Sequence, residues 1–307
     1  MSPLASTLPL RPGVDRAALA PLALSFSALC WAGNFVAGRA LRHDIDPATL
    51  TLLRWSLTLL LLLCWVGPRA WRCRRVIVRE WPLLFGLGAT GIAAFHTLAY
   101  LSLAHTSAIH SMLMLSLTPA AILVAAALTG AAWPSRRQWA GAGLSMLGAA
   151  VLVTRGDASL LLALHAGPGE LWMRLAVACW AAYSLLLRRR PADLPNDVTL
   201  AASCVPAIGL LLALVAFTAP HAAIEPTPRL VGLLAYIVVF ASLIPFLLWS
   251  WAVGVIGPER AGPYVHLLPL FGTGLAVLLL GESIAAPQLA GGALVLAGLV
   301  LAHRTSS

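Results

Sequence analysis

Polar and aromatic side chains recur at helical spacing inside stretches that are otherwise apolar. His96 and Tyr100 are four residues apart, and so are His110 and Met114. Residues at this spacing share one face of a helix. Aromatic rings beside a few hydrogen-bonding groups are typical of sites that bind an amphipathic organic molecule. The full set of predicted cavity residues is Trp31, Asn34, His96, Tyr100, His110, Met114, Trp180, Tyr183, Trp249, Tyr264 and His266.

Each of these residues also has a structural interpretation. Trp31 and Trp249 are typical of core packing or of an interfacial aromatic belt, and a single intramembrane histidine is often a satisfied core residue. However, polar side chains inside lipid are costly unless they face protein or water. The set therefore predicts a cavity, although no single member does.

The surrounding sequence is that of a membrane protein. Of its 307 residues, 60% are hydrophobic and only 10% are charged, whereas soluble domains carry roughly 25% charged residues. A transmembrane helix needs about 20 predominantly apolar residues. Ten such runs lie near residues 18–40, 47–66, 81–103, 106–128, 137–154, 170–187, 198–219, 229–252, 258–280 and 284–302. We predict an all-α integral membrane protein with ten transmembrane helices and no soluble domain.

The chain also contains an internal repeat. Three residues recur 149 positions later: Cys30, Trp31 and Ala32 as Cys179, Trp180 and Ala181. Four recur 150 positions later: Pro119, Gln138, Gly141 and Gly148 as Pro269, Gln288, Gly291 and Gly298. Copies with five helices each must enter the bilayer in opposite orientations. We therefore predict a cytoplasmic tail at residues 1–17, followed by two inverted five-helix repeats at residues 18–155 and 165–303.

Prolines and glycines lie at matched positions in the predicted repeats. Pro119 and Pro269 each remove a backbone hydrogen bond and should interrupt the fourth helix. Interrupted helices at matched positions indicate a transporter binding site, so both prolines are predicted hinges. The alternative is that proline is commoner in membrane helices generally. Glycines seven residues apart in each fifth helix share one face and should allow close packing against a neighbouring helix.

The basic residues predict the orientation. All twenty are arginine, and with the N-terminus inside, fourteen fall on the cytoplasmic side, four fall outside, and Arg54 and Arg174 lie within predicted spans. This positive-inside bias places both termini in the cytoplasm of a multi-pass plasma (inner) membrane protein. The net charge of +9 then follows from topology and gives no indication of nucleic-acid binding. The five cysteines are expected to be reduced, without a disulfide framework.

Arg54 falls inside a predicted helix, about seven residues and roughly 10 Å from its outer end. We expect its guanidinium to snorkel to the outer surface or to bind helix-end carbonyls. The alternative is that it attracts an anionic group of a substrate. Its nearest predicted acidic partners are Asp44, Asp46 and Glu282, all on the outer side.

Motifs of other function classes are missing from the sequence. There is no G-x-S-x-G, H-E-x-x-H or Cys-x-x-Cys motif, so we expect no enzyme, no catalytic residue, no metal and no cofactor. The absence of a phosphate-binding glycine loop with lysine excludes an ATP-driven pump within this chain. A membrane sensor, a receptor or a facilitative channel on the same bundle remains the alternative to a transporter.

Histidine is the candidate for proton coupling because its ordinary pKa is about 6.5. All eleven acidic residues are expected in loops or at helix ends, which leaves no buried carboxylate for a proton relay. We predict His266, or with less support His96 or His110, as the coupling residue. Otherwise the protein is a facilitator or an exchanger.

Several stretches resemble the EamA-like family of the drug/metabolite transporter superfamily. They are CWAGNFV (30–36), LRW (53–55), residues 100–107, LTP (117–119), GPERA (257–261), LPLF (268–271), LGE (280–282) and residues 288–298. The resemblance covers nearly the whole chain in order. It implies two inverted five-helix repeats around a central cavity. One departure is that Glu282 has Ala132 as its repeat mate, which argues against a role shared by a symmetric acid pair.

The resemblance also implies a function. We expect a secondary-active exporter of small amphipathic metabolites by alternating access, with amino acids or related compounds, or toxic organic cations, as substrates. The expected partners are this small molecule and the lipid bilayer, and the chain is expected as a monomer or homodimer.

Overall fold

The computed structural model describes residues 16–106, 108–129, 133–162, 167–218, 225–280 and 285–303. Within these ranges the chain is helical and has no β-strand, so the all-α prediction is confirmed for them. Glu282 and the N-terminal tail up to residue 15 lie outside the described residues. Three segments depart from α-helical geometry: η1 and η2 are π-helices, and η3 is a 3₁₀-helix.

The helices fall into two sets, each with one π-helix inside its third long helix. The first set is α1 (Arg16–Ala40), α2 (Pro47–Arg72), α3 (Arg74–Arg79), α4 (Trp81–Leu87), η1 (Gly88–Ala94), α5 (Phe95–His105), α6 (Ala108–Leu115), α7 (Thr118–Leu128), α8 (Arg136–Thr154) and α9 (Ser159–Leu162). The second set is α10 (Pro168–Leu187), α11 (Asn196–Thr218), α12 (Pro228–Tyr236), η2 (Ile237–Leu243), α13 (Ile244–Ile256), α14 (Pro258–Ala261), η3 (Gly262–His266), α15 (Leu267–Leu280) and α16 (Ala286–His303).

Local sequence explains where several helices begin. The Asp46 carboxylate accepts hydrogen bonds from the backbone N–H groups of Ala48 and Thr49, at 3.1 and 3.0 Å, at the start of α2. Ser135 and Gln138 form a reciprocal capping box at the start of α8. Such caps satisfy backbone donors that a helix leaves unpaired at its N-terminus.

Seven described helices are long and apolar enough to cross a membrane, judged by length and composition. They are Arg16–Gly38, Pro47–Arg72, Trp81–His105, His110–Leu128, Pro168–Leu187, Asn196–Thr218 and Pro228–Ile256. The other three predicted spans are also helical but do not meet this standard. The glycine- and alanine-rich α8 covers residues 137–154, residues 258–280 are divided among α14, η3 and α15, and the apolar part of α16 is shorter. The protein is therefore a multi-pass membrane protein.

Both fourth helices are broken near the matched prolines. Residues 116 and 117 separate α6 from α7, and Pro119 lies in the first turn of α7. Pro269 lies in the first turn of α15, directly after the 3₁₀ segment η3. Because proline lacks a backbone N–H, it fits best in the first turn of a helix, where that N–H would have no partner within the helix. The interruptions are thus present, while the hinge role stays a prediction.

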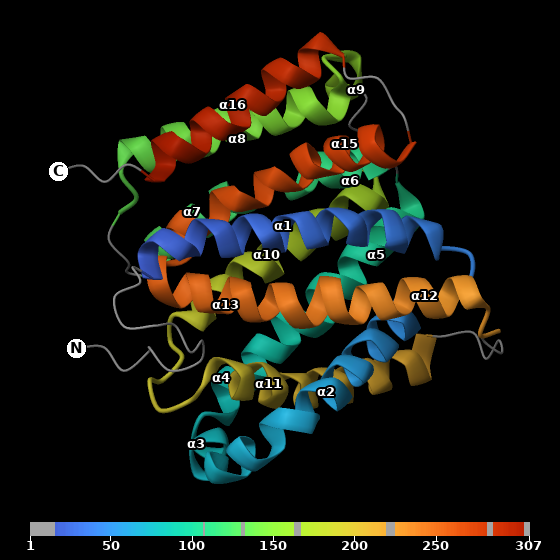
Figure 1. Ribbon diagram of the computed structural model, residues 1–307, viewed down its shortest axis with the longest axis vertical. Coiled ribbons are helices and arrows are strands. Elements are labelled where there is room, and N and C mark those ends of the chain that lie inside the picture. The colour runs from blue at the N-terminus through green and yellow to red at the C-terminus, as the bar shows by residue number, and fades with distance from the viewer. Residues whose placement is uncertain are drawn as a thin grey trace.

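Each half of the protein makes equivalent packing contacts with the other half. In Figure 1, α8 and α16 pair along one edge of the bundle, and α2, α3 and α11 lie at the opposite edge. Between them, α1 packs against α13 and α15, while its counterpart α10 packs against α5 and α7. In the same way, α2 packs on η2 and α11 packs on η1. The core of the protein is therefore the surface shared by the two halves.

Glycines bring α8 and α16 into backbone contact. A Cβ atom added at Gly148 would lie 2.6 Å from the Gly291 carbonyl oxygen, and one added at Gly298 would lie 2.6 Å from the Gly141 carbonyl oxygen. A real side chain has no room at such distances. The predicted close packing of these glycine faces is confirmed, and the neighbour is the fifth helix of the other half.

Candidate functional site

A buried arginine organises the polar contacts at the centre of the bundle. The Arg54 side chain of α2 is 0% exposed. Its Nε donates to Ser242 Oγ at 2.5 Å, and its Nη2 donates to the Ala241 carbonyl at 2.5 Å. Its Nη1 donates to Asn34 Oδ1 at 3.3 Å and to the Tyr100 hydroxyl oxygen at 3.0 Å. One guanidinium therefore joins α1, α2 and α5 of the first half to η2 of the second.

The π-helix η2 supplies the backbone acceptor for this arginine. Short π-helical segments inside α-helices frequently mark functional sites. The Ser242 hydroxyl donates to the Ile237 carbonyl, five residues earlier, at 2.8 Å. The Ala241 carbonyl accepts from the Trp31 indole N–H at 3.0 Å as well as from Arg54. The segment thus presents one carbonyl to side chains from two other helices.

The two π-helices occupy equivalent positions in the two halves. η1 begins at Gly88 and η2 at Ile237, an offset of 149 residues, and both contain seven residues. The same offset places Ser203 of α11 at the position of Arg54. A Cβ added at Gly88 would lie 2.3 Å from the Ser203 carbonyl oxygen, so α11 touches η1 closely. Both halves share this architecture, but only the first contributes the charge.

Aromatic rings from both halves meet beside the polar network. Trp31 and its repeat mate Trp180 contact edge to face, with ring centroids 5.2 Å apart. Trp249 lies 5.6 Å from Trp31 and 5.3 Å from Trp180. Phe246 lies 5.9 and 5.5 Å from the same two rings. Such pairs contribute attraction beyond that of buried area alone, so this cluster fixes the centre of the bundle.

A small cavity of about 30 Å³ lies between the aromatic cluster and the polar network. Its lining consists of Trp31, Asn34, Phe35, Phe95, His96, Ala99, Tyr100, Leu103, Leu115, Thr118, Trp180, Val265 and Leu268. Five of the predicted cavity residues are therefore brought together: Trp31, Asn34, His96, Tyr100 and Trp180. A volume of this size has room for one or two water molecules. The conformation is closed around its centre.

The other six predicted residues lie outside this lining, and four of them are buried or half-buried in the surrounding core. Trp249 is buried behind Trp31 and Trp180, and Tyr183 is buried with its ring 5.2 Å from that of Trp180. Met114 is half-buried in α6 and packs against the core. Tyr264 is buried in η3, next to a residue that lines the cavity. In this conformation these side chains surround the cavity at a greater distance.

His266 is held between α8 and the break in the fourth helix of the first half. Its ring is 1% exposed. Nε2 lies 2.7 Å from the Ser116 carbonyl, and Nδ1 lies 2.6 Å from Ser145 Oγ. Because a carbonyl only accepts, Nε2 must be the protonated nitrogen that donates. The ring does not line the cavity, and its coupling role stays a prediction.

His110 belongs to a separate polar cluster at one end of the bundle. Thr106 Oγ1 donates to Glu170 Oε1 at 2.5 Å, and His110 Nδ1 lies 3.2 Å from the same oxygen. Glu170 is 6% exposed, and Asp197 at the start of α11 is 8% exposed. The expectation that no carboxylate is buried is therefore wrong. Both acids are at helix ends as predicted, but the packing of neighbouring helices covers those ends.

A comparison with family models supplies the classification. The model of the EamA-like transporter family matches residues 18–154 and 167–304. The chain belongs to this family. The family is described as one of transporters, and the matched pair of segments agrees with an internal repeat.

Individual relatives of this EamA-family protein cover it to different extents. An "Uncharacterized transporter" of Archaeoglobus fulgidus is 25% identical over 91% of this chain and 96% of its own length. The chain spans about half the length of two other curated relatives: 55% of "Uncharacterized transporter YyaM" of Bacillus subtilis, at 26% identity, and 57% of "Probable amino-acid metabolite efflux pump" of Salmonella typhimurium, at 27% identity. A solved crystal structure with 20% identity matches 92% of this chain and 97% of its own with a TM-score of 0.74, which shows the fold alone.

Sequence reasoning placed the transporter's Arg54 wrongly. The guanidinium does not snorkel outward, because neutral acceptors on η2 and two neighbouring helices hold it at the centre. Sequence reasoning also missed Ser242 and Phe246. Ser242 directly follows the acceptor Ala241, and the pattern of apolar residues does not predict a π-helix. Phe246, like many apolar residues, could be assigned to the site only once the halves were packed.

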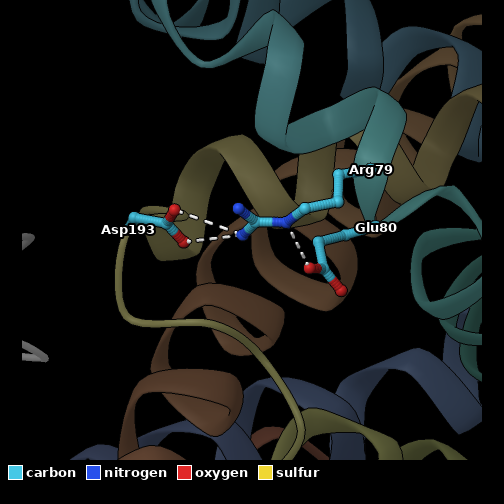
Figure 2. Close-up of polar contacts among 3 residues, drawn as sticks. All are labelled: Arg79, Glu80 and Asp193. Atoms are coloured by element: carbon cyan, nitrogen blue, oxygen red, sulfur yellow. Dashed lines mark hydrogen bonds and ion pairs between the residues drawn. The ribbon is translucent and has the colours of Figure 1, made fainter.

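Ion pairs link the two halves of the transporter at the end of the bundle opposite to Glu170. Arg69 Nη2 and Asp197 Oδ2 are 2.7 Å apart. In Figure 2, Arg79 lies between Glu80 and Asp193, with its Nε donating to Glu80 Oε1 at 2.8 Å and its Nη2 to Asp193 Oδ2 at 3.2 Å. Hydrogen bonds to these two carboxylates, Glu80 first, raise the pKa of Arg79.

The described residues contain no group of three His, Cys, Asp or Glu side chains that could hold a metal ion.

Proposed function

We propose that this EamA-family protein is a secondary-active exporter of small amphipathic metabolites, amino acids or related compounds, that works by alternating access. The observation that carries the proposal is the cavity between the two halves, which has an aromatic wall at Trp31 and Trp180 and a polar wall at Asn34 and Tyr100. The chemistry of this lining suits a solute with an apolar and a polar part, and the cavity of about 30 Å³ must widen to admit one. The name of the Salmonella relative, which includes amino-acid metabolite efflux, supports the same solute class.

The proposed topology has ten transmembrane helices in two inverted repeats, at residues 18–155 and 165–303. The three helical segments beyond the seven long apolar spans supply the remaining crossings. Exchange of equivalent contacts between the halves supports a two-fold relation. The arginine distribution supports cytoplasmic termini in an inner membrane.

Alternating access requires that either end of the bundle can separate, and each end has polar contacts between the halves. The span Trp81–His105 connects the two ends, because Arg79 precedes it and Thr106 follows it. At the Arg79 end, Asp193 and Asp197 of the second half pair with arginines of the first. At the Thr106 end, Glu170 binds the first half. Breaking one set opens the cavity to one side only.

Pro119 and Pro269 are the proposed hinges, because the helix breaks beside them leave backbone that can bend without losing a complete helical ladder. His266 connects one break to the other, since its ring bonds the Ser116 carbonyl and lies directly before α15. Because Nε2 already carries a proton, a second proton would bind Nδ1 and change its contact with Ser145 Oγ on α8, which supports the proposed role of His266 in coupling.

Efflux from proteoliposomes tests the proposal. Vesicles are loaded with a pool of labelled amino acids and lipophilic cations, and the wild type is compared with Trp180→Ala and Trp172→Ala. Trp172 is the matched control because it lies on the same helix, is half-buried and does not line the cavity. We expect saturable efflux that is lost in Trp180→Ala and retained in Trp172→Ala. Folded wild type that moves none of these solutes would contradict the proposal and favour a sensor.

A further inference from the structure

Arg54 carries a buried charge that no carboxylate balances. Its acceptors are the neutral oxygens of Ser242, Ala241, Asn34 and Tyr100, and none of the ion pairs among the described residues includes it. An unpaired charge in a membrane bundle is costly and marks a functional site by default. A purely structural bridge between helices could be built from neutral groups at lower cost. The arginine therefore has the character of a receptor for a negative charge.

The arginine faces the cavity through two of its own acceptors. Asn34 and Tyr100 both accept from Nη1 and both line the cavity. Tyr100 also donates its hydroxyl proton to Asn34 Oδ1 at 3.0 Å, and that proton can turn to a ligand instead. Trp180 lines the same cavity, and its buried indole N–H has no hydrogen-bond partner in the described part of the chain. Donors therefore dominate the polar lining.

The other half of the protein lacks this cationic wall. At an offset of 149 residues, the mates of Arg54, Asn34 and Tyr100 are Ser203, Tyr183 and Trp249. The fold is duplicated, but the second copy replaces the charged and amide side chains with a small hydroxyl and aromatic rings. The cavity lining shows the same asymmetry, because the second half contributes only Trp180, Val265 and Leu268 and the first half contributes Asn34 and Tyr100, with Arg54 behind them.

We propose that the cavity binds its solute through a carboxylate, which the side chains of Asn34 and Tyr100 receive with Arg54 behind them as the counter-charge. This inference rests on the proposed transport function and narrows its substrates to zwitterions and monocarboxylates, to the exclusion of organic cations. A carboxylate beyond these two side chains lies roughly 6 Å from the guanidinium, about two hydrogen-bond lengths. At an effective dielectric constant of about 20, this separation favours an anion by roughly 100-fold.

Three solutes that share one apolar part but differ in their charged groups test whether the site requires a carboxylate. They are L-leucine, its deaminated acid 4-methylpentanoate and its decarboxylated amine 3-methylbutylamine. Binding to purified protein in nanodiscs is followed by tryptophan fluorescence, which reports on the cavity because Trp31 and Trp180 line it. Flux of each labelled solute is followed in proteoliposomes. We expect the wild type to bind and carry leucine and the acid, and to reject the amine.

Two substitutions and one control test the role of the arginine. Arg54→Gln should weaken binding of the acid by roughly 10- to 100-fold. It should leave binding of the amine as weak as in the wild type or make it slightly tighter. Arg54→Lys keeps the charge and should retain part of the preference for the acid over the amine. Ser203→Ala changes the equivalent position of the other half, whose hydroxyl has no partner among the described residues, and should keep the wild-type order.

The outcomes distinguish the two proposals. If Arg54→Gln does not fold, the wild type and Arg54→Lys still test the carboxylate site. Equal binding of amine and acid by the wild type overturns it. Flux of leucine with an unchanged acid preference in folded Arg54→Gln overturns it too, while leaving transport intact. No binding and no flux of any of the three by folded wild type would count against both the carboxylate site and the proposed exporter.

Discussion

The backbone contact between α8 and α16 gives the sharpest prediction for stability. Gly148→Ala adds one methyl group at a position where a Cβ would lie 2.6 Å from the Gly291 carbonyl oxygen and 2.6 Å from the Val295 backbone nitrogen. Gly143→Ala adds the same methyl group to the same helix, at a position where no atom beyond the adjoining backbone of that helix lies within 4 Å. The two variants differ only in what the methyl group meets.

The expected difference follows from this geometry. Replacing glycine with alanine in a helix interior is worth about 1 kcal/mol of helix propensity, and this gain is common to both variants. Overpacking a close contact costs about 1–3 kcal/mol. The nearest atoms at Gly148 are backbone atoms, so they cannot rotate aside and the two helices must separate. We therefore expect Gly148→Ala to be less stable than Gly143→Ala by about 1–3 kcal/mol.

Thermal unfolding in detergent, followed by tryptophan fluorescence at one scan rate, measures the difference. We expect the midpoint of Gly143→Ala to equal or exceed that of the wild type, and the midpoint of Gly148→Ala to fall below it. Leu294→Gly, which removes the Cβ atom that lies 2.9 Å from the added atom, should not rescue the variant because the backbone clash remains. Equal midpoints for the two alanine variants would refute the inferred backbone contact.

Three further predictions concern gating and coupling. Asp197→Asn removes the charge that pairs with the partly exposed Arg69, a contact worth up to about 1 kcal/mol. A cysteine placed at Ala99 should then react about fivefold faster with an impermeant thiol reagent added on the cytoplasmic side, and no faster with reagent added outside. Reactivity that is unchanged, or that rises equally on both sides, contradicts the role of this ion pair as a gate. Glu170→Gln should make the same cysteine more reactive from the outside only, and both variants are made in a protein without native cysteines. If Glu170→Gln raises reactivity from the cytoplasmic side instead, the Glu170 end of the bundle faces the cytoplasm and the assigned orientation is wrong. His266→Gln should flatten the pH dependence of efflux, and a fully retained pH profile would remove this histidine from coupling.

Much of the fold followed from the sequence because its signals are local. The seven long apolar helices overlap predicted spans, since about 20 apolar residues in a row have few alternatives. The repeat register located the helix breaks beside Pro119 and Pro269. It also predicted glycine faces on the fifth helices, although only the structure showed that these faces meet each other.

The candidate site was predictable in part. Trp31, Asn34, His96, Tyr100 and Trp180 were singled out as polar or aromatic groups in apolar runs, and they line one cavity. His110 was singled out by the same criterion and lies in a different cluster at one end of the bundle. The criterion detects the cost of a polar group in lipid, but it does not say which partner offsets that cost.

The sequence by itself determined that this chain lies in a membrane as a duplicated helical bundle, because apolar length and repeated residues are properties of the chain alone. Only the tertiary structure decided where Arg54 points. The helix of Arg54 would allow the side chain to reach outward, and the acceptors that hold it inward are Ala241 and Ser242, almost 190 residues away on a π-helix. A buried charge goes to the place where its hydrogen bonds are satisfied, and that place exists only after the two halves have packed together.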